Sequence, residues 1–231
     1  MVDRKLAPEA STRPKVVVWG ASGHALVVAD VMREMGMYDL VGFLDDVNPE
    51  PRWLARHEAW VLGGPEQIPR LLEAGVQSVL VGIGDCEARL RIADGARAAG
   101  LRLASAVHPH ATVARDVAVG PGTLVCAGVI VQPGSSIGEN VILNTAATVD
   151  HECIIEDGAH IGPGAHLGGN VVVGRAAWVG IGAIVSNNVS IGARSVLGAG
   201  AVLVRDLPAA VVAFGVPATV RRESTTLATA G

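Results

Sequence analysis

A six-residue repeat of aliphatic side chains runs through residues 113–203 and constrains the fold more than any other feature of the chain. The sixteen repeat positions hold Val113, Val119, Val125, Val131, Ile137, Leu143, Val149, Ile155, Ile161, Leu167, Val173, Val179, Val185, Ile191, Leu197 and Leu203. The residue two places before each is uncharged and no larger than valine. A period of six matches neither an α-helix nor an alternating strand. It fits a chain that turns a corner every six residues, with one large and one small side chain directed inward on each flat side.

Three flat sides close one coil of about 18 residues, and successive coils stack at the strand spacing of about 4.8 Å. The repeat therefore predicts a triangular parallel β-helix of about five coils. Glycine and small residues suit its corners. A Gly/Val-rich low-complexity region is the alternative, but such a composition does not hold sixteen aliphatic residues in one register.

The first hundred residues show a different pattern. An apolar strand at 15–19 is followed by a glycine turn at 20–24, a helical pattern, and a second strand at 38–44 that ends at Asp45 and Asp46. This order is typical of the first unit of a doubly wound α/β fold. The turn and the helix N-terminus favour a bound phosphate, and the aspartates suit a ribose or base. The turn is GxxG rather than GxGxxG, so a tight turn that needs no ligand is the alternative.

Further elements are expected along this part of the chain. A segment at 61–64 leads into a helix at 65–74, a buried strand over 77–85 ends in a second glycine turn, a helix covers 86–99, and 101–107 is the last strand. The chain thus divides into a flexible tail (1–13), a Rossmann-like domain of the nucleotide-binding type (14–107), a β-helix (108–208) and a partly ordered C-terminal tail (209–231). The fold class is an α/β domain followed by an all-β parallel β-helix.

Composition and charge argue against several classes of function. The net charge is −4 and no basic run stands out, so we expect no nucleic-acid partner. No apolar run reaches membrane-spanning length without Gly, Pro or charge, and residues 1–13 lack the apolar region of a signal peptide. The three cysteines form no CxxC pair, which favours a reducing, cytoplasmic setting.

The polar residues of the β-helix concentrate at 144–152, with His160 and His166 shortly after. Asn144 and His160 are 16 residues apart, so they lie near one edge on successive coils. His151 is nine residues from His160, which is half a coil away and across the prism. One chain alone should not bring them together, so a site containing all of them must lie between two chains.

Two readings stay open for several of these residues. Gly169 lies one coil beyond His151 and should stack on it. Its N–H either faces a developing oxyanion, or Gly169 only turns a corner. His151 beside Glu152 has the character of a general base. A zinc site from the three histidines is disfavoured by their spacing, and no metal is expected.

Seven motifs stand together in one order. They are Gly20-Ala21-Ser22-Gly23-His24, Phe43-Leu44-Asp45-Asp46, Val81-Gly82-Ile83-Gly84-Asp85, Ala106-Val107-His108-Pro109, Asn144-Thr145, Asp150-His151-Glu152-Cys153 and Gly215-Val216-Pro217-Ala218. Through them, residues 14–222 resemble the bacterial sugar acyltransferases of the sialic-acid O-acetyltransferase type. The chain is most similar to the nucleotide-linked 4-amino-4,6-dideoxysugar N-acetyltransferases.

The resemblance implies a left-handed β-helix that forms a homotrimer, with acetyl-CoA as a co-substrate and no permanently bound cofactor. It assigns the catalytic roles to His151, Glu152 and Asn144. The residues it implies for the nucleotide-sugar are Gly20, Ser22, Gly23, His24, Asp45 and Asp46. Those it implies for acetyl-CoA are His160, Gly169, Gly198, Ala199, Gly215 and Pro217. An insert at 47–58 departs from the family pattern and leaves the nucleotide open.

The function predicted is acetyl transfer from acetyl-CoA to the 4-amino group of a nucleotide-linked dideoxy amino sugar. The alternatives are a sugar O-acetyltransferase of the sialic-acid type, a non-catalytic trimeric binding scaffold, and an NAD-dependent enzyme. The short GxxG turn disfavours the last of these.

Overall fold

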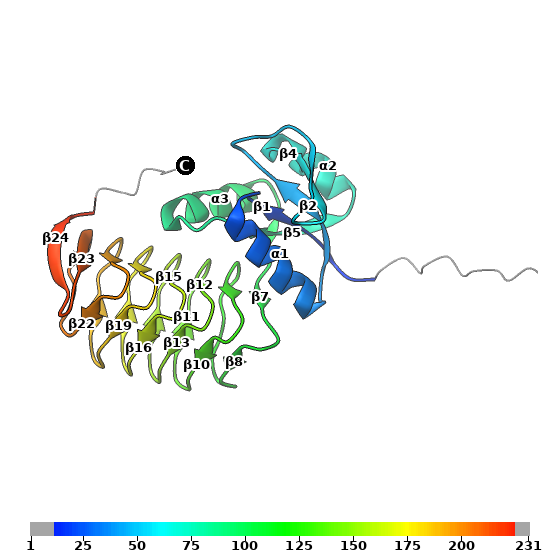
Figure 1. Ribbon diagram of the computed structural model, residues 1–231. Helices are drawn as coiled ribbons and strands as arrows, with labels where there is room; N and C mark the ends of the chain where they lie inside the picture. Colours follow the sequence, from blue (N-terminus) through cyan, green and yellow to red (C-terminus); the bar gives the residue numbers. More distant parts are fainter. Residues whose placement is uncertain (1–11, 225–231) are drawn as a thin grey trace, which may run out of the picture.

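A computed structural model describes residues 12–224, and the remaining residues of the two predicted tails lie outside this range. The chain forms two parts, an α/β domain and a long prism of short strands (Figure 1). The α/β sheet has the order β3-β4-β2-β1-β5-β6. Its strands are β1 (Lys15–Trp19), β2 (Asp39–Leu44), β3 (Arg52–Leu54), β4 (Ala59–Gly63), β5 (Val76–Val81) and β6 (Arg102–Leu103).

Alternating side chains of β1 face the two sides of this sheet, because successive residues of a strand point in opposite directions. Val16 and Val18 pack in one apolar cluster with α1, whereas Val17 and Trp19 belong to a second cluster with residues of α2 and α3. The helices are α1 (Gly23–Met35), α2 (Ile68–Glu73) and α3 (Cys86–Ala98), with a 3-10 turn over Pro65–Gln67. The sequence therefore gives a sheet covered on both faces, as predicted.

Two elements differ from the sequence expectation. The strand expected at 101–107 is two strands, β6 and β7 (Ala106–Val107), which belong to different sheets. β6 ends the α/β sheet beside β5, and β7 begins the prism beside β9. The insert at 47–58 contains β3, which pairs antiparallel with β4. No strand was expected there, because the insert carries no alternating apolar pattern.

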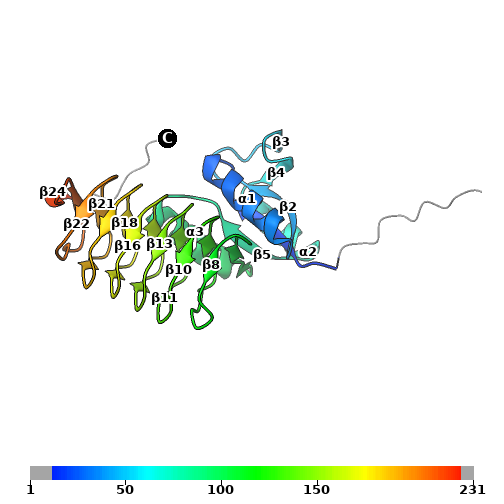
Figure 2. The same ribbon diagram turned by 60° about the horizontal axis from the view of Figure 1, so that its bottom comes forward.

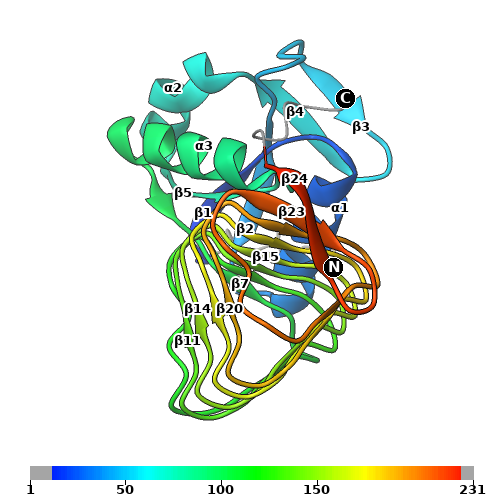
Figure 3. The same ribbon diagram turned by 90° about the vertical axis from the view of Figure 1, so that its left-hand side faces the viewer.

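Three sheets form the sides of the prism, and its triangular outline is clear in the end-on view of Figure 3. The domain face, on the side of the α/β domain, holds β7, β9 (Leu124–Val125), β12 (Ile142–Leu143), β15 (His160–Ile161), β18 (Trp178–Val179), β21 (Val196–Leu197), β23 (Val211–Phe214) and β24 (Thr219–Glu223). The second face holds β8 (Thr112–Val113), β10 (Ile130–Val131), β13 (Thr148–Val149), β16 (His166–Leu167), β19 (Ile184–Val185) and β22 (Val202–Leu203). The third face holds β11 (Ser136–Ile137), β14 (Ile154–Ile155), β17 (Val172–Val173) and β20 (Ser190–Ile191).

Apart from β23 and β24, neighbouring strands on each face are parallel and 18 residues apart in register, as in the pairing of Ile142 with His160. This confirms the β-helix, and its arrangement fits a left-handed one. Of the sixteen repeat aliphatics, all are buried except Val113 and Val119, which are half-buried. Those two lie in the first coil, where no earlier coil covers them (Figure 2).

Two positions at each corner of the prism restrict which residues can occupy them. The residue after the repeat aliphatic lies against the next coil: a Cβ on Gly180 would approach the backbone N of Ala199 to 2.6 Å. Glycine permits this close approach in half of the repeats, whereas other repeats hold a side chain at the same position, such as Asn144 and Asp150. The residue two places further on has a positive φ throughout residues 122–200. That position mostly holds Gly, Asn or Ala, and in two places it holds a larger residue, Glu152 with φ 59° and Arg194 with φ 60°.

The prism is closed at its far end by the C-terminal segment. β23 continues the parallel pairing beside β21, and β24 folds back on it antiparallel. These strands lie beyond the range 108–208 expected for the β-helix, because the pairing continues after the aliphatic repeat stops. Gly215 and Pro217 form the turn between them, and the carbonyl of Gly215 accepts a hydrogen bond from Val202 N. Within 12–224 no helix has the length and hydropathy needed to cross a bilayer.

Candidate active site

His151 and Glu152 lie at the corner between the second and third faces, which we term the second corner. Glu152 Oε2 is 3.1 Å from His151 Nδ1, and the two side chains are 57% and 71% exposed. The backbone N–H of His151 donates to Asp150 Oδ1 at 2.8 Å, which fixes the turn. The pair has the geometry of a carboxylate that orients an imidazole and stabilises its protonated form.

Glu152 occupies the left-handed position of its coil. One coil earlier this position holds Gly134, and one coil later it holds Asn170, the two residue types that adopt such a backbone most readily. A glutamate there costs about 1–2 kcal/mol. The left-handed backbone recurs at this repeat position throughout residues 122–200, with Ala146, Ala176 and Arg194 among its other occupants, and at residue 152 it places a carboxylate beside His151.

Gly169 stacks on His151, as the 18-residue spacing predicts. A Cβ built on Gly169 would lie 2.6 Å from both Cε1 and Nε2 of the imidazole. The φ of Gly169 is not in the left-handed region, so the corner itself does not require glycine here. Its N–H has no hydrogen-bond partner among the described residues. The space occupied by the imidazole, rather than the turn, explains this glycine.

Asn144 and His160 meet at the corner between the domain face and the second face, which we term the first corner. Asn144 Nδ2 is 3.1 Å from His160 Nε2, and Asn144 Oδ1 accepts a hydrogen bond from Thr145 N at 2.8 Å. The oxygen of the amide is thereby identified, so Nδ2 is the donor to His160 Nε2. His160 Nδ1 then carries the proton and points to the carbonyl of Gly84, 3.3 Å away.

His160 is buried where the α/β domain meets the prism, with 4% of its surface exposed. Its ring lies 4.4 Å from the ring of Trp178 and 6.2 Å from that of His24. Burial, with a smaller contribution from the charge of Arg89, lowers the pKa of His160 to about 3 and that of His24 to about 4. Both imidazoles are therefore neutral at pH 7. The resemblance assigns His160 to acetyl-CoA, and this stays a prediction; within one chain the ring lies behind Asn144 and hydrogen-bonds its amide.

The first and second corners lie on opposite edges of the second face, so one chain does not bring Asn144 and His151 together. This agrees with the half-coil separation inferred from the sequence. Gly198 and Ala199 lie at the first corner, three coils beyond Asn144, whereas Gly169 lies at the second. The residues assigned to acetyl-CoA are thus divided between two edges of the prism and the C-terminal turn.

The glycine turn after β1 lies beside the turn after β5, where the strand order of the α/β sheet reverses. A Cβ on Gly20 would approach the carbonyl oxygen of Gly82 to 3.0 Å. Open α/β sheets bind ligands at such a switch point. Ser22 precedes α1 as its N-cap residue and is exposed, Gly23 begins the helix, and His24 reaches the prism.

Asp45 is engaged by the insert. Its Oδ2 is 2.6 Å from Arg52 Nη2, and its Oδ1 accepts hydrogen bonds from Val47 N and Asn48 N, both at 3.1 Å. Asp46 is exposed beside it. The insert therefore closes over the first aspartate and leaves the second at the surface, which the sequence motif alone did not distinguish.

His166 lies on the second face, where its Nδ1 is 2.8 Å from Thr148 Oγ1. Among residues 12–224, no group of three or more His, Cys, Asp or Glu side chains is arranged to hold a metal ion. The zinc alternative for His151, His160 and His166 is therefore not supported, because the three rings lie on different parts of the prism.

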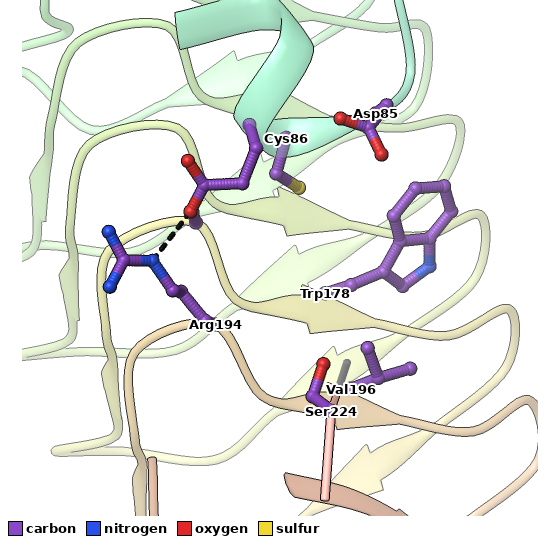
Figure 4. Close-up of a pocket in the computed structure, with 8 residues that line it drawn as sticks. Asp85, Cys86, Trp178, Arg194, Val196 and Ser224 are labelled. Atoms are coloured by element: carbon purple, nitrogen blue, oxygen red, sulfur yellow. Dashed lines mark hydrogen bonds and ion pairs between the residues drawn. The ribbon is translucent and has the colours of Figure 1, made fainter. Parts of the chain in front are cut away.

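The sequence reasoning did not single out Trp178 or Arg89. Trp178 follows His160 by one coil, and it lines a pocket at the N-terminus of α3 (Figure 4). The pocket is lined by Asp85, Cys86, Glu87, Ala176, Trp178, Arg194, Val196 and Ser224. Arg194 Nε donates to Glu87 Oε1 at 2.7 Å at its rim. Two features of the sequence could have pointed to them. Arg89 stands at a core position of its helix, and Trp178 is an aromatic residue that lies one coil after His160.

The fold and these corners define a β-helix acyltransferase that carries a Rossmann-like domain. Residues 15–96 match the family model described as the PglD N-terminal domain. PerB from Caulobacter crescentus, solved with CoA and GDP-perosamine, is 40% identical with a TM-score of 0.85, covering 90% of this chain and 97% of PerB. The acetyltransferase domain of PglB from Neisseria gonorrhoeae FA1090 is 35% identical with a TM-score of 0.84, covering 90% and 100%. WeeI from Acinetobacter baumannii AYE shares the fold at 22% identity and a TM-score of 0.76, covering 89% and 99%.

The chain therefore belongs to the family of nucleotide-aminosugar N-acetyltransferases with a left-handed β-helix. The resemblance inferred from the seven motifs is confirmed. PerB was solved with CoA and the PglB domain with acetyl coenzyme A, so relatives of this chain hold the coenzyme predicted as co-substrate.

Proposed function

We propose that this protein transfers an acetyl group from acetyl-CoA to the 4-amino group of a nucleotide-linked dideoxy amino sugar. The observation that carries the proposal is the His151–Glu152 pair at an exposed corner, in a chain 40% identical to a protein solved with CoA and GDP-perosamine. The family match argues against O-acetyl transfer, a non-catalytic scaffold and an NAD-dependent reaction. We further propose a cytoplasmic enzyme, because nucleotide-sugars and acetyl-CoA are made there.

In the proposed mechanism the sugar amine attacks the thioester carbonyl directly. A C–N bond forms, and the oxyanion faces the N–H of Gly169. His151 Nε2 accepts the proton of the amine, while its Nδ1–H donates to Glu152. The C–S bond then breaks, and the sulfur of CoA leaves with the proton from His151. No acyl-enzyme is required.

Three copies complete the site. A ring of three prisms with their second faces toward the axis would set the second corner of one chain beside the first corner of the next. His151 of one copy then meets Asn144 of its neighbour. The second face supports this arrangement, because Ile130 and Ile184 on it are 39% and 47% exposed. Gly198, Ala199, Gly215 and Pro217 line the same seam toward the far end, where the coenzyme would extend.

The α/β domain would hold the nucleotide. The turn containing Gly20, Ser22 and Gly23 offers backbone N–H groups and the N-terminus of α1 to the diphosphate. Asp46 is the exposed carboxylate for the nucleoside, with Asp45 held in place by Arg52. His24, at the base of this turn, joins the nucleotide side to the His160–Asn144 pair.

The test is release of free CoA thiol from acetyl-CoA with 4-amino-4,6-dideoxysugars linked to GDP, UDP and dTDP. We expect one nucleotide to support turnover, and a product amide that resists hydroxylamine, whereas an ester would be cleaved. His151→Ala should lose about 10²–10⁴ in turnover, the usual contribution of a general base. Its trimer mass and coenzyme binding should persist. Thiol release by His151→Ala at the wild-type rate, or a monomeric wild-type protein, would refute the proposal.

A further inference from the structure

Arg89 lies on α3 with 1% of its surface exposed, at the junction of the two parts of the molecule. Its guanidinium donates to several backbone carbonyls, and the thiol of Cys86 is its side-chain partner. Nε bonds Asn140 O at 2.8 Å, Nη1 bonds Gly84 O at 2.8 Å and Ile83 O at 3.1 Å, and Nη2 bonds Gly158 O at 2.7 Å. Two longer bonds reach Asp85 O at 3.4 Å and Ala159 O at 3.3 Å. One side chain thereby ties the second glycine turn to two successive coils.

A buried cation without a carboxylate costs several kcal/mol in desolvation, so packing alone does not explain it. Among the ion pairs of the described residues, none includes Arg89. A rigid planar fork with five donors can satisfy carbonyls from three segments at once, which lysine or leucine cannot. Two of those segments adjoin His160: Gly84, whose carbonyl faces its ring, and Ala159, which precedes it.

We infer that Arg89 is a positioning residue for acetyl transfer. By fixing the carbonyl of Gly84 over Nδ1 of His160, it holds His160 as the Nδ1–H tautomer. His160 Nε2 is then a hydrogen-bond acceptor, which orients Asn144 and leaves the second amide hydrogen of Asn144 directed to the seam between copies. The role in transfer rests on the proposed function, whereas the tautomer does not.

The charges around His160 reinforce this arrangement. The groups that face it are His24 from α1 and Arg89 from α3. Asn144 and Trp178, from the first corner and β18, do not titrate. Burial and then the Arg89 charge lower the pKa of His160, with His24 contributing in the same direction. A neutral acceptor at Nε2 is therefore maintained over the whole working pH range.

The tautomer is tested on the wild-type protein labelled with ¹⁵N-histidine, with the His160 signals assigned from a His160→Gln variant. We expect the nitrogen shifts of a protonated Nδ1 and an unprotonated Nε2 at pH 7, with no titration of the ring down to pH 5. A protonated Nε2, or a midpoint above pH 6, would overturn the inference whether or not any Arg89 variant folds.

The positioning role is tested with Arg89→Met and Arg89→Lys, and with Arg91→Met at an exposed position of the same helix as control. We expect kcat to fall on the order of 10²-fold in the first two, since small misplacements near the reacting groups have such effects. KM for acetyl-CoA should change little. In Arg89→Met the pKa of His160 should rise, because the Arg89 charge contributes to lowering it, and the same nitrogen shifts measure this change.

The possible failures are distinguishable. Absence of transfer by the wild-type enzyme on every amino sugar tested would refute the proposed function and leave the tautomer result standing. An active wild-type enzyme whose Arg89→Lys variant keeps its kcat would refute the positioning role. A loss of melting temperature with an unchanged kcat would show that Arg89 only joins the two parts of the molecule.

Discussion

The substitution Gly169→Ala tests the active-site geometry through a single methyl group. The new Cβ would lie 2.6 Å from Cε1 and Nε2 and 3.2 Å from Nδ1 of His151. Carbon atoms in favourable contact are about 3.5–4.0 Å apart, so the imidazole must move by about 1 Å. The backbone at this position suits alanine, and the obstructing atoms are the end of an exposed side chain. The fold should therefore accommodate the change, while His151 loses its position.

A displacement of about 1 Å at a reacting group costs on the order of 10² in rate. We expect Gly169→Ala to lower kcat by that factor in the thiol-release assay, with the mass of the assembly and the melting temperature unchanged. Gly95→Ala on the exposed side of α3, where nothing lies within 4 Å of the new Cβ, is the matched control and should keep full activity.

A double-mutant comparison separates the imidazole from the oxyanion. If Gly169→Ala acts by moving His151, it should cost little further activity in a His151→Ala background, because effects on one unit are not additive. Wild-type kcat in Gly169→Ala would refute the stacking argument. A full 10²-fold loss in both backgrounds would place the effect on the N–H of Gly169 instead.

Three further predictions concern stability. The lowered pKa values of His24 and His160, about 4 and about 3, mean that the unfolded chain binds more protons below pH 6.5. Between pH 6.5 and pH 4, each of the two imidazoles should therefore lower the free energy of unfolding by roughly 1 kcal/mol for every unit that the pH falls. The urea midpoint should depend less steeply on pH in His160→Gln, and an unchanged slope would contradict this. Ile161→Ala, at a fully buried repeat position, should cost about 2–5 kcal/mol in urea unfolding, and Val113→Ala at the open end should cost clearly less. Glu152→Gly places the residue that best tolerates a left-handed backbone at this position, so it should raise the free energy of unfolding by up to about 1 kcal/mol while kcat falls. A lower free energy of unfolding in this variant would argue against strain at residue 152.

The prism was predictable because the burial of its side chains repeats at a fixed interval along the chain. One side chain in six must fill the interior, so the register can be counted from the chain, and stacking one coil apart follows at once. This is why the neighbours Asn144 and His160, and Gly169 and His151, were placed correctly from spacing alone. The assignment of catalytic roles to these residues remains a prediction.

The junction between the two parts was not predictable in the same way. Its contacts join residues far apart in the chain, such as Arg89 with Gly158 and His24 with His160, and no period connects them. The split of 101–107 into two strands has the same origin: each half pairs with a different sheet, and nothing in the segment itself states which. Likewise, the pairing of Asp45 with Arg52 depends on how the insert folds back.

The parallel register of the coils gives this molecule a discrete unit of length. Between the second corner at His151 and the hairpin at Gly215, each coil adds about 4.8 Å along the axis. Insertion or deletion of one 18-residue unit in this stretch would move the hairpin by that step while the α/β domain, His160 and His151 keep their places. The distance from the His151–Glu152 pair to the C-terminal hairpin can thus change in whole steps, with the pair itself left intact.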